Sequence, residues 1–234
     1  MPCAGTIASL VAGVVLAASE PVVIGTEAPF PAYTYLAEDG TITGHDRDLM
    51  DDICARQHWR CEWQNVHFDE LIPGVMSGRF DIIIGGIAVT AERRDLVDFT
   101  QAFSNSSPEE WFVGHPGAPN PDQALIAFQS GTVHEAHLKE TDYSFRSYAT
   151  ETQVLDALAL GTVDLALGPF YTREDLAPLI DANDLDFLYP VMIPDDGIAM
   201  AVCRGNTDLL DSLNAALDAM RTDGTLAALE DRWF

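Results

Sequence analysis

One continuous stretch, residues 68–103, constrains the fold more than any other part of the chain: FDELIPGVMSGRFDIIIGGIAVTAERRDLVDFTQAF. Apolar residues recur at helical spacing over residues 68–76, which predicts an amphipathic helix. Residues 81–84 then predict a short buried strand, and a Gly-Gly turn with Thr90 leads into a second helix that carries Arg93. In open α/β sheets, small ligands bind where strands end. The stretch therefore predicts a small-molecule site at the carboxyl end of this strand.

The start of the second helix indicates the chemistry of the ligand. Arg93 lies in its first turn, where backbone N–H groups have no partner within the helix. A helix N-terminus attracts anions, and arginine binds carboxylates through two parallel hydrogen bonds. The alternative is that Arg93 is a surface residue paired with Asp95 or Asp98. We expect Arg94, one position further round the helix, to face solvent.

The charge of the chain narrows the choice of partners. It contains 37 acidic and 12 basic residues, and its formal net charge is −25. Such a charge argues against nucleic acid and against an anionic membrane surface as partner. Adaptation to a saline environment would explain it, and so would a cationic ligand, although the acids are spread along the whole chain. No Cys/His cluster has zinc spacing, so we expect neither a metal nor a cofactor.

Residues 1–19 resemble an export signal. They carry no charge, and their apolar core, residues 7–18, is too short for a confident membrane span. Small residues directly before Glu20 are typical of a cleavage site. A buried N-terminal helix or a retained membrane anchor would be the alternative reading of this segment.

The rest of the chain alternates between predicted strands and helices, which indicates parallel sheets. Polar breaks interrupt this alternation at two places and enclose a middle segment that repeats the same pattern. We therefore expect two α/β lobes, each a sheet flanked by helices, joined by two hinge strands. The expected first lobe comprises residues 20–108 and 195–234, and the expected second lobe comprises residues 109–194.

Two cysteines, Cys54 and Cys61, span the end of a predicted helix and the start of a predicted strand. An exported protein can oxidise such a pair, and closing so short a loop would stabilise the fold by roughly 2–3 kcal/mol in the chain-entropy model. The alternative is a pair of unbridged buried thiols, because free cysteine is often part of a core.

Taken together, these segments resemble the family 3 extracellular solute-binding proteins of polar amino-acid ABC importers. The resemblance covers residues 22–234. It is carried by residues 68–103, by GHDRDLMDDIC and by the closing segment LNAALDAMRTDGTLAALEDRWF. It implies a two-lobed type II periplasmic binding fold and a periplasmic, monomeric protein that is not an enzyme. Such a protein captures a small carboxylate, such as an amino acid or opine, by lobe closure and delivers it to an inner-membrane ABC permease. The resemblance also implies the disulfide.

The family pattern assigns roles to residues in both lobes. Arg93 would hold the ligand carboxylate through a bidentate ion pair, assisted by backbone N–H groups around Gly86, Ala88 and Thr90. Thr132, in the segment QSGTVHEAHL, would donate its N–H and hydroxyl groups to the same carboxylate. Thr132 could equally be a simple helix N-cap, and both roles are compatible.

The resemblance also places side chains beside the rest of the ligand. Phe30 and Phe68 match positions where the family sets large apolar groups against it, although either could be ordinary core. Glu27 falls where the family often has a polar or acidic residue near the side chain or ammonium of the ligand.

Two departures from the family pattern concern the identity of the ligand. Ala88 stands where the family usually has serine or threonine, and Pro169 stands where it has an aspartate that binds the ligand ammonium. A buried ammonium without an anion is costly. Either Glu27, Glu109 or Glu110 replaces the aspartate, or the ligand lacks an ordinary free ammonium, as an N-substituted amino acid does.

Two other functions are compatible with the same scaffold. A cyclohexadienyl dehydratase-like enzyme would need a cleft acid, for which Glu27, His134 or Glu109 could serve, but no catalytic pair emerges from their spacing. A periplasmic sensory protein would bind its ligand in the same way and dock on a receptor. We expect capture for import rather than either of these.

Overall fold

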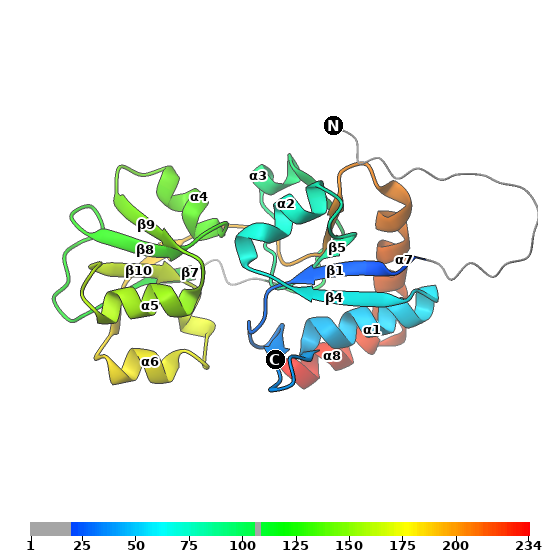
Figure 1. Ribbon diagram of the computed structural model, residues 1–234, viewed down its shortest axis with the longest axis horizontal. Helices are drawn as coiled ribbons and strands as arrows, with labels where there is room; N and C mark the ends of the chain where they lie inside the picture. The colour runs from blue at the N-terminus through cyan, green and yellow to red at the C-terminus, as the bar shows by residue number, and fades with distance from the viewer. Residues whose placement is uncertain (1–19, 106–108) are drawn as a thin grey trace, which may run out of the picture. The chain divides into compact units, whose positions relative to one another are not determined.

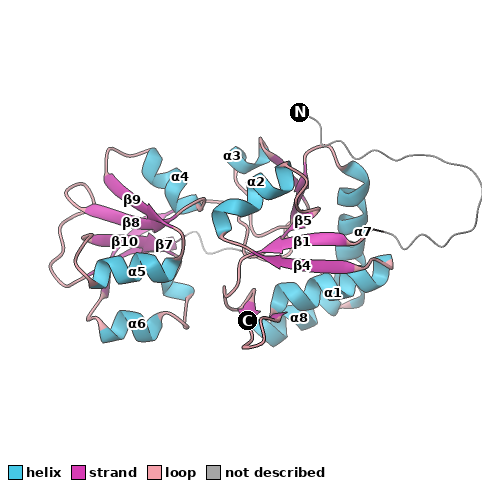
Figure 2. Ribbon diagram, viewed as in Figure 1, coloured by secondary structure: helices cyan, strands magenta, loops and turns pink. Residues whose placement is uncertain are grey.

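The computed structural model describes residues 20–105 and 109–234, and these form two compact units, each built on its own β-sheet (Figures 1 and 2). The first unit comprises residues 20–66, 71–104 and 198–234. The second comprises residues 67–70, 105 and 109–197. The expected signal peptide, residues 1–19, lies outside the described residues. Each sheet is flanked by helices, so the expected α/β class is confirmed.

The sheet of the first unit has parallel strands at its centre. Its five strands, in spatial order, are β4 (Cys61–Asn65), β1 (Val22–Thr26), β5 (Ile82–Ile83), β12 (Ala201–Cys203) and β6 (Val97–Phe99). Strand β1 is parallel to both β4 and β5, whereas β12 is antiparallel to β5 and β6. The carboxyl ends of β1, β4 and β5 therefore lie at one edge of the sheet, and the loops that follow them begin there.

Helices complete the first unit, together with a small hairpin. These elements are β2 (Tyr35–Leu36), β3 (Ile42–Thr43), α1 (His45–Gln57), α2 (Leu71–Met76), α3 (Ala91–Arg94), α7 (Thr207–Asp223) and α8 (Thr225–Trp233). Helices α1, α7 and α8 pack against one another, and the side chains of Leu49, Ile53 and Leu217 are fully buried. The chain thus returns to its first sheet at its end. No helix of the described residues is long and apolar enough to cross a membrane.

Close packing of α2 on β1 depends on two glycines. The ring of Phe80 is buried against both of them, and a Cβ atom would lie 2.7 Å from ring atoms at Gly25 and 2.3 Å at Gly74. Any side chain at either position would have to displace the ring, because interiors are packed without spare volume.

The second unit also has parallel strands at the centre of its sheet. Its strands, in spatial order, are β11 (Asp186–Met192), β7 (Glu109–Gly114), β10 (Leu165–Gly168), β8 (Leu125–Gln129) and β9 (Ser144–Tyr148). Strand β8 is parallel to β9 and β10, whereas β7 is antiparallel to β10 and β11. The helical elements are η1 (Phe68–Glu70), α4 (Val133–Lys139), α5 (Glu151–Ala159), η2 (Phe170–Thr172) and α6 (Ala177–Ala182).

Both faces of this second sheet are covered. Successive side chains of a strand point to opposite faces, so Ile126 and Phe128 of β8 join one apolar cluster with Leu138 of α4. Ala127, between them, joins the other cluster with Val154 of α5. A strand buried on both sides is apolar throughout, which explains the continuous run LIAF in the sequence.

Three elements differ from what the sequence predicts. The expected helix over residues 68–76 is divided into η1 and α2, because Pro73 has no N–H and its ring clashes with the carbonyl four residues earlier. Strand β5 is shorter than residues 81–84, and the chain turns at Gly85 and Gly86, which have φ angles of 136° and 62°. Strand β9 gave no sequence signal, because most of its side chains are exposed and show no alternation.

A disulfide joins Cys54 of α1 to Cys61 of β4, so this prediction is confirmed. The two Cα atoms are 6.4 Å apart, and seven positions separate the residues in sequence. The bond closes the short connection between the end of α1 and the start of β4, and thereby limits how far that connection can open.

Asp46 links the start of α1 to the Gly-Gly turn after β5. Its side chain is fully buried, and one carboxylate oxygen lies 2.9 Å from Nδ1 of His45. Burial raises the pKa of Asp46, and hydrogen bonds from His45 and from the backbone N–H of Gly86 act in the opposite direction. The turn that follows β5 is therefore hydrogen-bonded to a buried side chain of α1, a helix of the same unit.

We expect the double substitution Cys54→Ser with Cys61→Ser to lower the free energy of unfolding by about 2 kcal/mol, because the unfolded chain regains its loop entropy. Urea unfolding followed by tryptophan fluorescence measures this change, since Trp59 and Trp63 flank Cys61. The reduced wild-type protein should match the variant. Unchanged stability in both samples would show that this loop constraint contributes nothing.

We expect Asp46→Ala to lower the free energy of unfolding by about 2 kcal/mol or more, because the N–H of Gly86 loses its acceptor inside the protein. Asp46→Asn keeps one acceptor oxygen and should cost clearly less. Asp51→Ala, at an exposed position of the same helix, is the control. Equal losses for the Ala and Asn variants would contradict the proposed link to Gly86.

Candidate functional site

Two loops of the first unit lie against each other at the carboxyl edge of its sheet. One follows β1 and carries Glu27 and Phe30; the other follows β5 and carries Gly86. A Cβ atom on Gly86 would lie 2.5 Å from the Phe30 ring, and the φ angle of Gly86 is 62°. Both the contact and the backbone conformation therefore require glycine. The expected site residues of these two loops are brought together.

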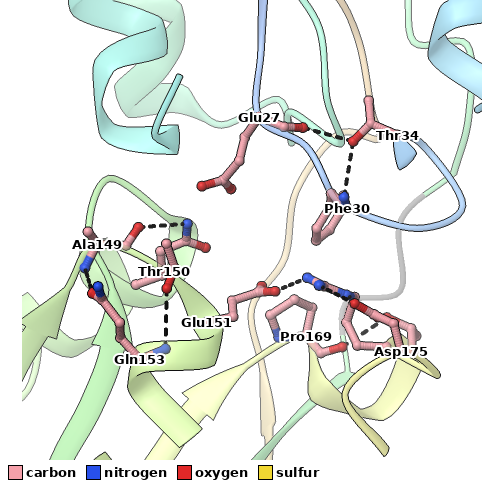
Figure 3. A network of polar contacts seen from close by, with 12 residues as sticks. Glu27, Phe30, Thr34, Ala149, Thr150, Glu151, Gln153, Pro169 and Asp175 are labelled. Atoms are coloured by element: carbon pink, nitrogen blue, oxygen red, sulfur yellow. Dashed lines mark hydrogen bonds and ion pairs between the residues drawn. The ribbon is translucent and has the colours of Figure 1, made fainter. Parts of the chain in front are cut away.

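Thr34 holds the loop that follows β1. Its hydroxyl donates a hydrogen bond to the carbonyl of Glu27 at 2.8 Å and accepts one from the N–H of Phe30 at 3.1 Å (Figure 3). The Phe30 ring stacks on Tyr33, with centroids 5.6 Å apart. Phe30 and Glu27 are half-buried, so neither is part of the closed core. The loop presents an aromatic ring and a carboxylate from a fixed backbone.

Arg93 is positioned by the loop that precedes its own helix. The hydroxyl of Thr90 accepts a hydrogen bond from the N–H of Arg93 at 3.2 Å and so caps α3. The guanidinium turns back, and its Nη1 donates to the carbonyl of Ala88 at 2.7 Å. Arg93 is buried, at 6% exposure, whereas Arg94 is exposed as expected. Arg93 is therefore not a surface residue, and its charge lies directly beside the loop after β5.

In the second unit, Thr132 follows β8 at the carboxyl edge of that sheet. It occupies the N-cap position of α4, but its hydroxyl donates to the carbonyl of Gln129 at 2.7 Å instead of capping the helix. The hydroxyl thus closes the turn after β8. That the N–H and hydroxyl of Thr132 donate to a ligand stays a prediction.

Phe68 lies in η1 and belongs to the second unit, where it is half-buried. The residue that follows it, Asp69, lies so close to Gly131 that a Cβ atom there would be 2.8 Å from the Asp69 Cα. Gly131 also has a φ angle of 78°. The turn that contains Thr132 therefore packs against the backbone of η1.

Two of the acids considered as ammonium partners lie in β7. Glu109 is exposed. Glu110 is half-buried, and its Oε1 is 3.7 Å from Nε2 of His134, a buried histidine whose ring nitrogens make no hydrogen bond among the described residues. Glu110 is thus directed to a histidine of its own unit.

A cluster that sequence reasoning missed lies at the same edge of the second sheet as Thr132. Nε and Nη2 of Arg173 donate to the two oxygens of Asp175, each at 2.8 Å, and Nη1 pairs with Glu151 (Figure 3). Only 7% of the Glu151 side chain and 5% of the Arg173 side chain are exposed. Burial alone would raise the pKa of Asp175, but hydrogen bonding to Arg173 and its charge outweigh burial and lower that pKa.

The described residues contain no group of three or more His, Cys, Asp or Glu side chains arranged to hold a metal ion. What the two carboxyl edges present instead is a buried guanidinium, that of Arg93, in the first unit and a buried carboxylate, that of Glu151, in the second. Such groups recognise the charged ends of small polar molecules.

Comparison with known proteins identifies the family. Residues 22–234 match the bacterial extracellular solute-binding proteins, family 3. The L-arginine-binding protein of Pseudomonas aeruginosa is 28% identical over 93% of this chain and 89% of that protein. The lysine/arginine/ornithine-binding periplasmic protein of Escherichia coli K12 is 27% identical over 97% of this chain and 94% of that protein.

Comparison with solved structures also finds amino-acid-binding proteins of similar fold. A periplasmic His/Glu/Gln/Arg/opine family-binding protein from Silicibacter pomeroyi, in complex with lysine, has a TM-score of 0.78 and 28% identity over 91% of this chain and 96% of that one. An ancestral amino-acid-binding protein, a precursor of cyclohexadienyl dehydratase, has a TM-score of 0.73 at 23% identity, which shows the fold alone. Because the family match includes both sheets and runs to the end of the chain, the protein belongs to family 3 of the bacterial extracellular solute-binding proteins.

Proposed function

We propose that the protein captures an amino acid, or an amino-acid derivative, in the periplasm and delivers it to an inner-membrane ABC permease. The observation that carries this proposal is the buried guanidinium of Arg93 beside the loop that follows β5. In an α/β sheet this edge is the usual place for a small ligand. A guanidinium there selects a carboxylate, the group that all amino acids share.

The arrangement of Arg93 favours tight binding. Its Nη1 is already held by the carbonyl of Ala88, so little side-chain freedom remains to be lost when a ligand arrives. Its burial lowers the local dielectric constant, which strengthens the attraction to a carboxylate. The Gly-Gly turn before it is hydrogen-bonded to the buried carboxylate of Asp46, so the backbone beside Arg93 is also held in the absence of a ligand.

Basic amino acids are the first ligands to test. The relatives with 28% and 27% identity are named for arginine and for lysine, arginine and ornithine. The net charge of −25 also favours a cationic ligand over an anionic one. N-substituted amino acids such as opines are the second class, because Pro169 cannot provide a carboxylate for a ligand ammonium.

We propose binding rather than catalysis. The relatives compared above are binding proteins by name. Of the three groups that a dehydratase-like reaction could use as its acid, Glu27 is half-buried, Glu109 is exposed and His134 is directed to Glu110. Incubating the protein with prephenate or arogenate and following product absorbance tests this point. Turnover would contradict it.

Calorimetric titration of the purified protein with the twenty amino acids and with octopine tests the ligand class. We expect tight binding, with a dissociation constant of about 1 μM or lower, for at least one basic amino acid. Simple carboxylates such as acetate should bind far more weakly, because they lack the remaining contacts. Failure of every amino acid and opine to bind would contradict the proposed function.

We expect Arg93→Ala to weaken the binding of the tightest ligand by about 100-fold or more, because the carboxylate loses a charged, bidentate partner. Arg93→Lys should not restore full affinity, since an ammonium cannot form the paired hydrogen bonds. Arg94→Ala, at the exposed neighbouring position, is the matched control and should bind like the wild type. Full affinity of the Ala variant would place the carboxylate elsewhere.

A further inference from the structure

The first turn of α1 is hydrogen-bonded to the loop that follows β1. The N–H of His45 donates to the carbonyl of Ala32 at 3.2 Å, and the N–H of Asp46 donates to the carbonyl of Tyr33 at 3.0 Å. The first amide groups of a helix need acceptors from outside it, and the N-cap, Gly44, has no side chain to supply one. The loop carbonyls take this role, so the loop and the start of α1 are joined through their backbones.

The side chain of His45 is fully buried within an aromatic cluster. Its ring stacks on Phe103 with centroids 5.7 Å apart, and it meets the rings of Tyr33 and Phe234 edge-on at 6.3 and 5.3 Å. Tyr33 in turn stacks on Phe30, the aromatic residue of the candidate site, at 5.6 Å. A continuous series of ring contacts, each within the range of favourable aromatic pairs, therefore connects Phe103 to Phe30.

Phe103 gives this series a firm support. Phe103 is buried, and its N–H donates to the carbonyl of Ile198 at 2.9 Å, while the N–H of Ile198 donates to the carbonyl of Ser104 at 2.9 Å. The chain leaves the first unit after Ser104 and re-enters it at Ile198. The ring of His45 is therefore packed against two chain segments that are hydrogen-bonded to each other.

The polar edge of the same ring acts on the other loop of the candidate site. Nδ1 of His45 lies 2.9 Å from Oδ1 of Asp46, whose carboxylate also accepts a hydrogen bond from the N–H of Gly86. Nε2 of His45 has no hydrogen-bond partner among the described residues. A buried N–H without an acceptor is costly, so the ring proton is placed on Nδ1 and donated to Asp46. This bond sets the direction of the carboxylate that holds the Gly-Gly turn.

We propose that His45 is a positioning residue of the ligand site, which sets the loop after β1 through Tyr33 and the loop after β5 through Asp46. Because His45 is fully buried, it acts without touching the ligand. Loops that are ordered in the absence of a ligand lose less conformational entropy when the ligand binds, which raises affinity. The inference deepens the proposed function, and it rests on that function for the effect on affinity.

Two variants of His45 and one control test the proposal. His45→Ala removes both the ring and Nδ1, whereas His45→Phe keeps an aromatic ring but cannot donate to Asp46. The control is Leu213→Ala, which removes a fully buried side chain of α7. Its neighbour Ser212 accepts a hydrogen bond from Gln57, at the opposite end of α1 from His45. All three variants lose buried contacts, but only those of His45 should release the two loops.

Amide hydrogen exchange of the ligand-free proteins, followed by mass spectrometry, measures this release directly. In His45→Ala we expect exchange about 10-fold faster than in the wild type in peptides that cover residues 27–34 and 84–90, because local opening becomes easier. His45→Phe should show the faster exchange mainly in residues 84–90. Equal exchange in His45→Ala and Leu213→Ala overturns the proposal, and so does unchanged exchange of residues 84–90 in His45→Phe.

Calorimetric titration measures the consequence for binding, with L-arginine or whichever of the twenty amino acids the wild type binds most tightly. We expect His45→Ala to lose about 10-fold in affinity, because the loops must then be ordered on binding. His45→Phe should lose less, and Leu213→Ala should bind like the wild type. Unchanged affinity in both His45 variants overturns the proposal, while capture of an amino acid stands. If the wild type binds no amino acid, the proposed function fails, and the exchange measurement still decides whether His45 positions the loops.

Discussion

Parallel pairing of the central strands determines where each unit of this protein can bind a ligand. Strand β1 is parallel to β4 and β5 in the first sheet, and β8 is parallel to β9 and β10 in the second. Parallel strands must be connected through crossovers, so their carboxyl ends, and the loops that follow, collect at one edge. The polar residues of both candidate sites lie in these loops, while the apolar strands behind them form the cores.

The charged groups at these edges are buried in the absence of a ligand, and each is paired within its own unit. The guanidinium of Arg93 is held by the carbonyl of Ala88, and the carboxylate of Glu151 by Arg173. Each is stabilised by partners within its own unit, which limits the cost of removing it from water. In the proposed function, the ligand carboxylate would meet a guanidinium, that of Arg93, that is already oriented and only weakly screened.

Sequence reasoning succeeded where the local signal was strong and failed where it was weak. The segment around Arg93 combines a helical period, a buried strand, a Gly-Gly turn and a capping threonine. The structure contains a short strand, the turn and the threonine cap, and it divides the helical segment into η1 and α2. Strand β9 escaped prediction because an exposed edge strand shows no hydrophobic alternation. That omission also hid Glu151, which follows β9 directly and could not be assigned to the carboxyl edge without it.

The sequence by itself determined the family, the α/β class, the cysteine pair that forms the disulfide, and Arg93 as the candidate carboxylate partner, because each depends on residues close together in the chain. Only the tertiary structure decided which distant groups meet. Glu151 and Arg173 are separated by 22 positions, and Asp46 and Gly86 by 40. Such pairings follow from strand order and helix packing, which local sequence periodicity does not encode.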